Sequence, residues 1–275
     1  TLPVYDGELY LELHRGTLTA KQQIKKNNRM AENLLRMLEL CLTRSAVATH
    51  TPADGTALRP LWNTLLVNQF HDILPGSCIA AANDRSLHDM AEMLHTGSEL
   101  LRSWFAPAQN CYTVLNPLDE PCRDVFYLPQ IASGFIAQEP GVTLQNVVLA
   151  DGTAATAVYG LERPALGAAV LHFVPGEQPA QTSRFVYDGK TLTTPLLQVQ
   201  LDELGRITSL VTRADGMQWA DGPMNTLLMA EDVSAGWDGW DIDADCMMKL
   251  QPAARLTKQT VTADGPQEFR LHSRY

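Results

Sequence analysis

The residues best suited to chemistry in this sequence are His71 and Asp72, neighbours in the run NQFHDILPGS of residues 68–77. A neutral imidazole is a good ligand for Zn²⁺, and a carboxylate beside it can accept hydrogen bonds from hydroxyl groups. Catalytic zinc, however, usually takes three protein ligands and keeps a fourth position open. The sequence contains no H-x-D, H-x-H or H-E-x-x-H pattern. His71 alone therefore predicts one metal ligand, and the alternative is a helix-end histidine followed by an aspartate that caps the next turn.

Two further histidines, His88 and His95, stand seven residues apart on a segment with helical spacing. Seven residues of helix separate two side chains by roughly 10 Å along the axis, too far for one ion. Glu92 and Glu99 follow them at i+4, which favours solvated helix pairs instead.

A second segment, residues 3–17, is rich in acids and aromatics without helical spacing, and it includes His14. Its side chains could line a sugar site, because aromatic faces pack on pyranose rings and carboxylates bind hydroxyls. The alternative is an extended lead-in whose Gly16 turns the chain into the first helix.

A third segment, residues 231–245, holds six acids and two tryptophans without a basic residue. Three aspartates alternate from Asp241, as in an EF-hand loop, which would need glycine at the sixth position and glutamate at the twelfth. Cys246 and Pro252 stand at those positions, so the calcium interpretation fails. Trp237 and Asp238 remain as candidate sugar contacts.

The positions of apolar residues predict three amphipathic helices ahead of residue 107: one from Thr17 to about Ala46, one from Leu58 to the Pro75-Gly76 break, and one that Ser77 would cap. Short links between them are typical of a helical bundle. Beyond Pro107 come short β-rich runs between turn residues, at 112–115, 125–128, 142–149, 168–174, 196–201 and 206–211. This pattern predicts an antiparallel β-sandwich.

We therefore predict an α+β multidomain chain, with a three-helix bundle over residues 1–106, including an extended lead-in at 1–16, and a β-sandwich over 107–275. Thr1 is not an initiator Met, and the last residues still alternate like an interrupted strand. These ends predict a fragment whose sandwich is incomplete at its C-terminus.

The charge of the chain is unevenly shared between these two parts. Residues 1–106 carry 10 Lys+Arg and 11 Asp+Glu, and residues 107–275 carry 11 and 20, giving a net charge of -10. Neither part has the basic face that nucleic acid or an anionic membrane would require. Five scattered cysteines without a C-x-x-C pattern predict reduced thiols and a cytoplasmic location.

The three segments together resemble glycoside hydrolase family 38, the α-mannosidases, and its cytosolic and bacterial branch in particular. The matching stretches are LPVYDGELYLELHRGT at 2–17, residues 61–79 around His71-Asp72, and WDGWDID at 237–243, in the order that the family has them. Asn116-Pro117 also fits the start of the family's β region. Ser234 and Gly239 depart from residues common in relatives, which puts only the detail of that loop in doubt.

The resemblance implies an N-terminal α/β catalytic domain ahead of the bundle, absent from this chain. It implies that His71 is a ligand of a catalytic Zn²⁺, or Co²⁺ in some relatives, and that Asp72 contacts sugar hydroxyls. It places His14, Trp237 and Asp238 near the substrate. The other metal ligands and the nucleophilic aspartate would belong to the missing domain, so no catalytic residue is expected here.

The resemblance thus predicts part of a metal-dependent retaining α-mannosidase that hydrolyses terminal α-D-mannosides of oligosaccharides or glycosides and is inactive without its α/β domain. One alternative is a noncatalytic carbohydrate-binding or scaffold protein, complete as it stands. Another is a hydrolase of different specificity on the same scaffold, such as one acting on a phosphorylated or glycerate-linked mannoside. A homo-oligomer is left open.

Overall fold

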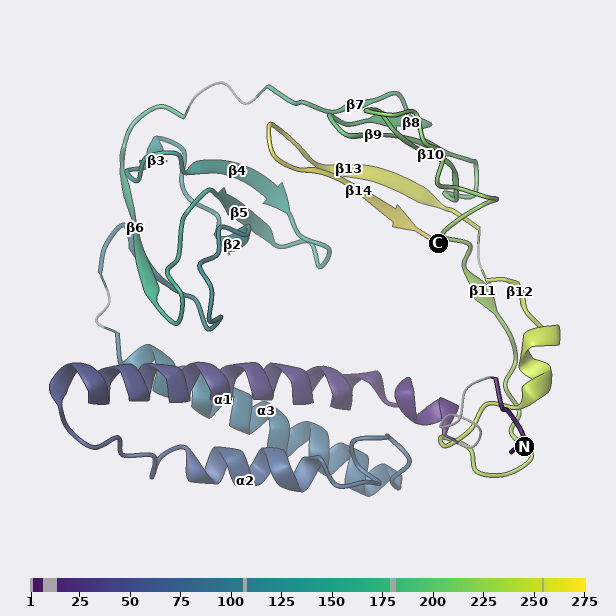
Figure 1. The fold of residues 1–275 in the computed structure, drawn as a ribbon, viewed down its shortest axis with the longest axis horizontal. Coiled ribbons are helices and arrows are strands. Elements are labelled where there is room, and N and C mark those ends of the chain that lie inside the picture. The colour runs from purple at the N-terminus through teal and green to yellow at the C-terminus, as the bar shows by residue number, and fades with distance from the viewer. Residues whose placement is uncertain (1, 7–13, 106–107, 179–181, 254) are drawn as a thin grey trace. The chain divides into compact units, whose positions relative to one another are not determined.

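The computed structural model describes residues 2–6, 14–105, 108–178, 182–253 and 255–275 (Figure 1). The chain divides into two compact units. The first comprises residues 1–107 with 230–249, and the second comprises residues 108–229 with 250–275. None of the helices described has the length and apolarity needed to span a bilayer.

The first unit is built on three helices, α1 (Gln22–Thr49), α2 (Arg59–Asn68) and α3 (Ala80–Ser103), with a 3-10 turn, η1 (Arg15–Leu18), before them. Each helix contributes apolar side chains at i, i+3, i+4 spacing to one core. The buried members of this core are Ala31, Leu35, Leu38, Leu58, Leu61, Leu65, Met90 and Met93. Gly97 lets α3 approach α1, since a Cβ there would stand 2.8 Å from Leu34 Cδ2. The predicted three-helix bundle is confirmed.

The start of α3 differs from the sequence-based expectation. Ile79, not Ser77, is the residue that precedes the helix, and its side chain makes no capping hydrogen bond. Ser77 Oγ instead points back to Asp72, 3.4 Å from its backbone oxygen and 3.5 Å from Oδ1. The prediction of Ser77 as the N-cap is therefore wrong, because a local hydroxyl–Asp contact within the turn competes with capping.

The second unit contains a sandwich of two antiparallel three-stranded sheets, ordered β1-β6-β3 and β2-β5-β4. Their bounds are β1 Cys111–Leu115, β2 Phe126–Pro129, β3 Phe135–Ala137, β4 Thr143–Val148, β5 Ala154–Tyr159 and β6 Ala168–Pro175. Leu144 and Val158 from one sheet meet Leu171 and Phe173 from the other in a shared core. The predicted helical domain followed by antiparallel sheets is thereby confirmed.

Further strands complete the second unit (Figure 1). A four-stranded sheet has the order β10-β9-β8-β7, and the pairs β11-β12 and β13-β14 form two ribbons. Their bounds are β7 Val186–Tyr187, β8 Thr191–Thr193, β9 Leu197–Leu201, β10 Ile207–Thr212, β11 Leu228–Met229, β12 Gln251–Pro252, β13 Lys258–Asp264 and β14 Phe269–Arg274. Ala263 of β13 packs on Val147, Ala155 and Ala157, so this ribbon covers the outer face of β2-β5-β4.

A set of polar side chains fixes the β13-β14 hairpin to that sheet. We call Tyr127, Gln145, Tyr159, Glu268 and Arg270 the Glu268 network. Both tyrosine hydroxyls donate to Glu268 Oε2 at 2.9 Å, and Arg270 Nη2 lies 2.5 Å from Glu268 Oε1. Buried Gln145 donates to the backbone oxygen of Glu268 at 2.7 Å and accepts from its N–H at 3.0 Å. Burial, followed by the hydrogen bond to Glu268, raises the pKa of Tyr159 above its ordinary value.

Candidate functional site

His71 and Asp72 lie in a tight turn just beyond the end of α2 at Asn68. Backbone hydrogen bonds from Ile73 and Leu74 to the Phe70 oxygen close this turn, at 2.9 and 3.1 Å. The His71 side chain is 71% exposed and that of Asp72 is 47% exposed, with Nε2 and Oδ2 3.4 Å apart. The ring of Phe70 packs against the imidazole at a centroid distance of 4.3 Å. The fold thus presents both side chains to solvent from a hydrogen-bonded turn.

Lys25 of α1 contacts the C-terminal end of that turn. Its Nζ donates to the backbone oxygens of Leu74 and Pro75, each at 3.0 Å, and to that of Ala20 at 2.5 Å. Partial burial lowers the pKa of this lysine below its ordinary value. One ammonium group therefore ties the 70–77 turn to the segment that leads into α1.

Gly76 allows the two segments to touch. Its φ of +84° lies in the left-handed region, and a Cβ there would stand 2.7 Å from the Ala20 oxygen. Any L-residue at this position would be strained and would clash with backbone. The prediction that the second helix reaches the Pro75-Gly76 break is wrong, because α2 ends at Asn68 and residues 70–76 form turns. Gly76 instead allows the 70–77 turn to approach the segment before α1, and we call the region where they meet the corner.

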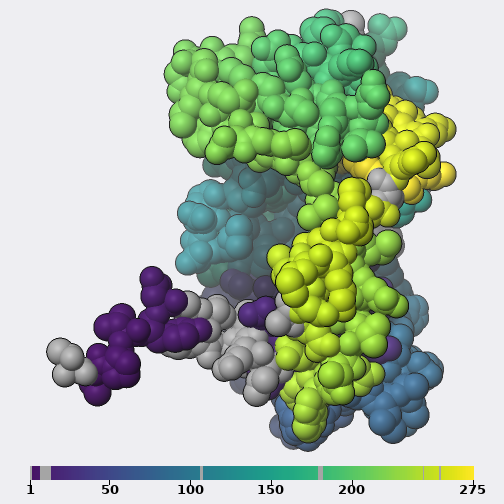
Figure 2. All heavy atoms as spheres, turned by 90° about the vertical axis from the view of Figure 1, so that its right-hand side faces the viewer, coloured from purple at the N-terminus to yellow at the C-terminus, as the bar shows by residue number. Residues whose placement is uncertain are grey.

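The segment at 237–241 completes the same corner. The Gly16 N–H donates to the Trp240 oxygen at 3.1 Å, and a Cβ on Gly239 would stand 3.7 Å from Ser77 Cα. Three stretches distant in sequence, around residues 14–20, 71–77 and 237–241, are therefore brought together within the first unit. In Figure 2 the atoms of residues 230–249, in yellow-green, gather on the face turned toward the viewer.

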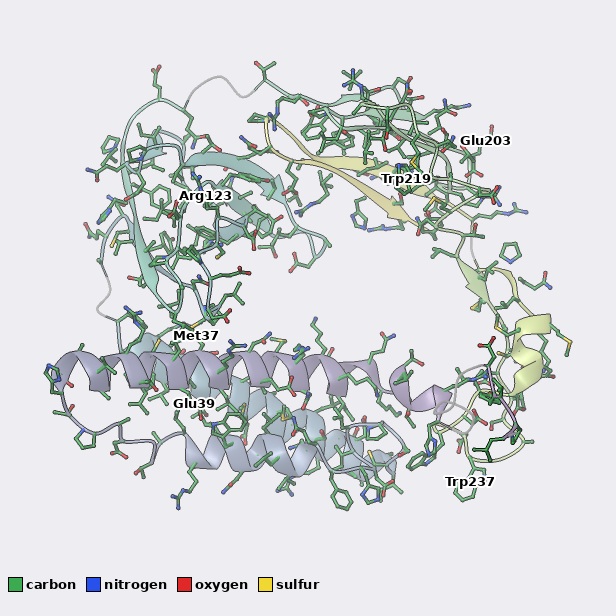
Figure 3. The ribbon with its side chains drawn as sticks, in the orientation of Figure 1. Met37, Glu39, Arg123, Glu203, Trp219 and Trp237 are labelled. Carbon is green, nitrogen blue, oxygen red and sulfur yellow. The ribbon has the colours of Figure 1, made fainter. Side chains whose placement is uncertain are left out.

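A pocket of about 270 Å³ opens at this corner, and its described lining residues are His14, Trp237, Trp240 and Asp241. The His14 and Trp240 rings meet edge to face at 5.6 Å. Trp237 is 78% exposed and lies at the outer edge of its loop, as Figure 3 shows. The structure thus brings His14 and Trp237 together, whereas Asp238 is exposed and is not among the described residues that line the pocket.

Two acidic residues of this loop already bond to other groups of the protein. Asp243 Oδ2 accepts from the Ala235 N–H at 3.3 Å, and Asp245 Oδ2 lies 2.7 Å from Lys249 Nζ. Among the residues that the structure describes, no group of three or more His, Cys, Asp or Glu side chains is arranged to hold a metal ion. His71 is accessible enough to be one ligand of such an ion, but the described part of the chain does not supply a full set.

The other sequence-predicted groups lie outside this corner. His88 Nε2 is 3.5 Å from Glu92 Oε1 on the exposed face of α3, as the i+4 spacing predicts. Residues 7–13, the most acidic and aromatic part of the lead-in, are outside the described residues. Sequence reasoning missed Lys25, Trp240 and Asp241, because a lysine on a polar helix face and an aspartate in an acidic run carry no local signal of their contacts.

Comparisons with known proteins identify what this chain is similar to. Residues 12–106 match the family model described as the alpha mannosidase middle domain. Alpha-mannosidase 2C1 of Homo sapiens is 33% identical over 254 residues, which are 86% of this chain and 22% of that protein. Alpha-mannosidase of Saccharomyces cerevisiae is 42% identical over 80 residues, which are 28% of this chain and 7% of that protein.

The fold is shared with solved structures. The crystal structure of an alpha-mannosidase from Enterococcus faecalis V583 superposes with a TM-score of 0.64 at 11% identity, covering 96% of this chain and 36% of that one. A second, of a protein in glycosyl hydrolase family 38 from Enterococcus faecalis, gives a TM-score of 0.54 at 13% identity, covering 92% of this chain and 35% of that one.

The helical unit matches the alpha mannosidase middle domain, and the chain as a whole shares its fold with part of a solved alpha-mannosidase. The chain belongs to glycoside hydrolase family 38, the α-mannosidases. It spans about a fifth of the length of the first curated relatives that it matches, 22% in each case.

Proposed function

We propose that this chain is part of a metal-dependent retaining α-mannosidase that hydrolyses terminal α-D-mannosides of oligosaccharides or glycosides. The observation that carries the proposal is the meeting of residues 14–20, 71–77 and 237–241 at one corner of the first unit. His71 and Asp72 are exposed there on a turn that Lys25 holds in place. Rigid support with exposed polar tips is the arrangement that a binding site requires.

His71 is proposed to be one ligand of a catalytic zinc ion, with cobalt as the alternative metal. When bound, such an ion holds the hydroxyl groups of a sugar and stabilises charge as a Lewis acid. Asp72, 3.4 Å from the imidazole, is proposed to accept a hydrogen bond from a sugar hydroxyl. His14, Trp237 and Asp238 remain proposed substrate contacts of lesser weight.

Hydrolysis with retention requires two carboxyl groups that flank the glycosidic bond, one as nucleophile and one as acid/base. We assign neither role to a residue of this chain. The nucleophile would belong to the α/β domain expected in the full-length enzyme. We therefore expect these 275 residues by themselves to be inactive on mannosides.

The proposal includes a cytoplasmic location. All five cysteines, Cys41, Cys78, Cys111, Cys122 and Cys246, are free thiols, which fits a reducing compartment. No nucleic acid or membrane is expected as a partner, given the net charge of -10. The oligomeric state stays open.

The test is metal analysis with an α-mannosidase assay of the full-length enzyme. His71→Ala should reduce bound zinc from about one ion per chain to near zero and abolish hydrolysis of an aryl α-mannoside. His88→Ala is the matched control, because His88 is also exposed and paired with a carboxylate, yet lies on the face of α3.

Retention of both zinc and activity in His71→Ala would exclude His71 from the metal site. A full-length protein without α-mannosidase activity that still binds mannosides would favour the alternative of a noncatalytic carbohydrate-binding protein. Activity confined to a phosphorylated or glycerate-linked mannoside would change the substrate class.

A further inference from the structure

Gln69, the residue directly after α2, attaches the N-terminal end of the 70–77 turn to α1. Its Nε2 donates to Asn28 Oδ1 at 3.0 Å and to Glu32 Oε1 at 3.1 Å. The Glu32 carboxylate also accepts from Asn28 Nδ2 at 3.1 Å and from Arg29 Nη1 at 3.0 Å. Hydrogen bonds to a charged acceptor are stronger than those between neutral groups. Three donors therefore hold this carboxylate in one position, and one of them is the side chain of Gln69.

The turn is thus attached to α1 at both of its ends, since Lys25 binds its C-terminal end. Lys25 and Glu32 stand at positions i and i+7 of α1, so their side chains leave the same face of the helix. That face contacts the chain on both sides of His71 and Asp72. A segment fixed at one end can pivot about it, whereas a segment fixed at both ends presents its side chains in a defined direction.

Apolar packing gives the N-terminal end of the turn little support. In the last turn of α2, Leu65 is buried in the core of the bundle. The side chains of Leu66, Val67 and Phe70, however, are exposed. The hydrogen bonds of Gln69 therefore supply an attachment to α1 that the apolar side chains on either side of it do not provide.

We propose that Gln69 and Glu32 are positioning residues, which set the direction in which His71 and Asp72 meet the substrate. Neither has a described hydrogen bond to His71 or Asp72, so both act through the backbone of the turn. The role rests on the proposed function, because it requires that the turn serves a substrate. Precise placement matters at such a site, since a displacement of about 1 Å can cost roughly 100-fold in rate.

The alternative is that these contacts only stabilise the packing of α1 on α2. Glu39 allows the two roles to be separated (Figure 3), because it lies about two turns further along α1 and accepts from Trp62 Nε1 of α2 at 2.9 Å. Glu39 and Glu32 thus make the same kind of contact at different distances from the turn. A role in stability alone predicts similar effects of the two glutamates on activity, whereas positioning confines the effect to Glu32.

The experiment measures the kinetics of the full-length enzyme on an aryl α-mannoside, with circular dichroism to check folding. Gln69→Glu removes the donor and places two carboxylates together, and it should lower kcat by roughly 10- to 100-fold, more than it raises KM. Glu32→Ala should act in the same direction. Glu39→Ala is the matched control and should leave kcat within about twofold of the wild type.

Exchanging the two partners provides a rescue. The double variant Glu32→Gln with Gln69→Glu again places an amide donor opposite a carboxylate, and it should return kcat to within about threefold of the wild type. Amide hydrogen exchange over residues 70–77, followed by mass spectrometry, is a readout independent of activity. It should accelerate in Gln69→Glu and slow again in the double variant.

Wild-type kcat in Gln69→Glu, a double variant as impaired as Gln69→Glu, or equal losses in Glu32→Ala and Glu39→Ala would each overturn the positioning role. Failure of the proposed function itself looks different, because the wild-type enzyme would then show no α-mannosidase activity. The positioning role would fall with it, and accelerated exchange in Gln69→Glu would then support only a structural attachment of the turn.

Discussion

The 70–77 turn and the Glu268 network are both polar, yet they use their polar groups in opposite ways. In the network, Glu268 Oε2 accepts from two tyrosine hydroxyls at 2.9 Å, and Oε1 forms an ion pair with Arg270. In the turn, the side chains of His71 and Asp72 are exposed, and His71 Nε2 lies 3.4 Å from Asp72 Oδ2. The turn is nevertheless held in place, from behind, by Lys25.

This difference separates two roles that look alike in sequence. A polar group that stabilises a fold is satisfied by the fold, because a buried unpaired group is costly. A polar group that serves a ligand is left accessible, and the rigidity it needs is supplied by other residues. On this basis we propose that the 70–77 turn is a binding element, whereas the contacts of the Glu268 network stabilise the fold.

The largest change in stability should come from the network. Gln145→Ala removes a buried side chain whose amide bonds both the N–H and the oxygen of Glu268; the N–H loses its acceptor, whereas the oxygen keeps the Gly265 N–H at 3.2 Å. We expect the free energy of unfolding of the second unit to fall by about 2–4 kcal/mol. Urea denaturation followed by circular dichroism measures this.

The control for that variant is Gln198→Ala, an exposed glutamine on β9. It should change the free energy of unfolding by less than about 0.5 kcal/mol. If both substitutions changed the free energy of unfolding equally, the Glu268 network would contribute no more to stability than an exposed glutamine does.

An intermediate effect is expected at the support of the turn. Lys25→Met keeps most of the aliphatic length but removes the donor to the Leu74, Pro75 and Ala20 oxygens. The first unit should lose about 1–2 kcal/mol of stability, and amide hydrogen exchange at residues 71–77 should accelerate.

Lys26→Met is the matched control, because Lys26 is the exposed neighbour on the same helix. It should leave hydrogen exchange at 71–77 unchanged. If Lys25→Met behaves like Lys26→Met, the turn is not held by the ammonium group, and its rigidity must arise from other contacts.

Much of the secondary structure follows from local pattern. The first and third helices and six of the strands were predicted within a few residues, since apolar periodicity and turn residues report on one face of an element. The second helix was predicted to continue to Pro75-Gly76 but ends at Asn68. Strands such as β7 and β11 have two residues each, too short to carry a period. The β5 strand was missed because four consecutive buried positions replace alternation where both faces are covered.

The candidate site was predictable only in part. His71-Asp72 stood out as a motif, and the family resemblance grouped it with the segments around His14 and Trp237. The contacts that bring these segments together are long-range and depend on Lys25, Gly16 and Gly76. No local pattern predicts which carbonyl a lysine will reach or which glycine admits a neighbouring backbone.

Substitution of Asp72 should have the smallest effect on stability and the largest on function. Comparing the two effects tests most directly whether Asp72 contacts the substrate. In the full-length enzyme, Asp72→Asn should leave the free energy of unfolding within about 0.5 kcal/mol of the wild type. It should lower kcat/KM for an aryl α-mannoside by about 100-fold or more, through loss of a charged hydrogen-bond acceptor to the sugar. The exposed Asp84→Asn should change neither quantity. The proposal that the 70–77 turn contributes to the active site would be contradicted if Asp72→Asn kept the wild-type kcat/KM. It would also be contradicted if the variant lost activity only because its free energy of unfolding had fallen.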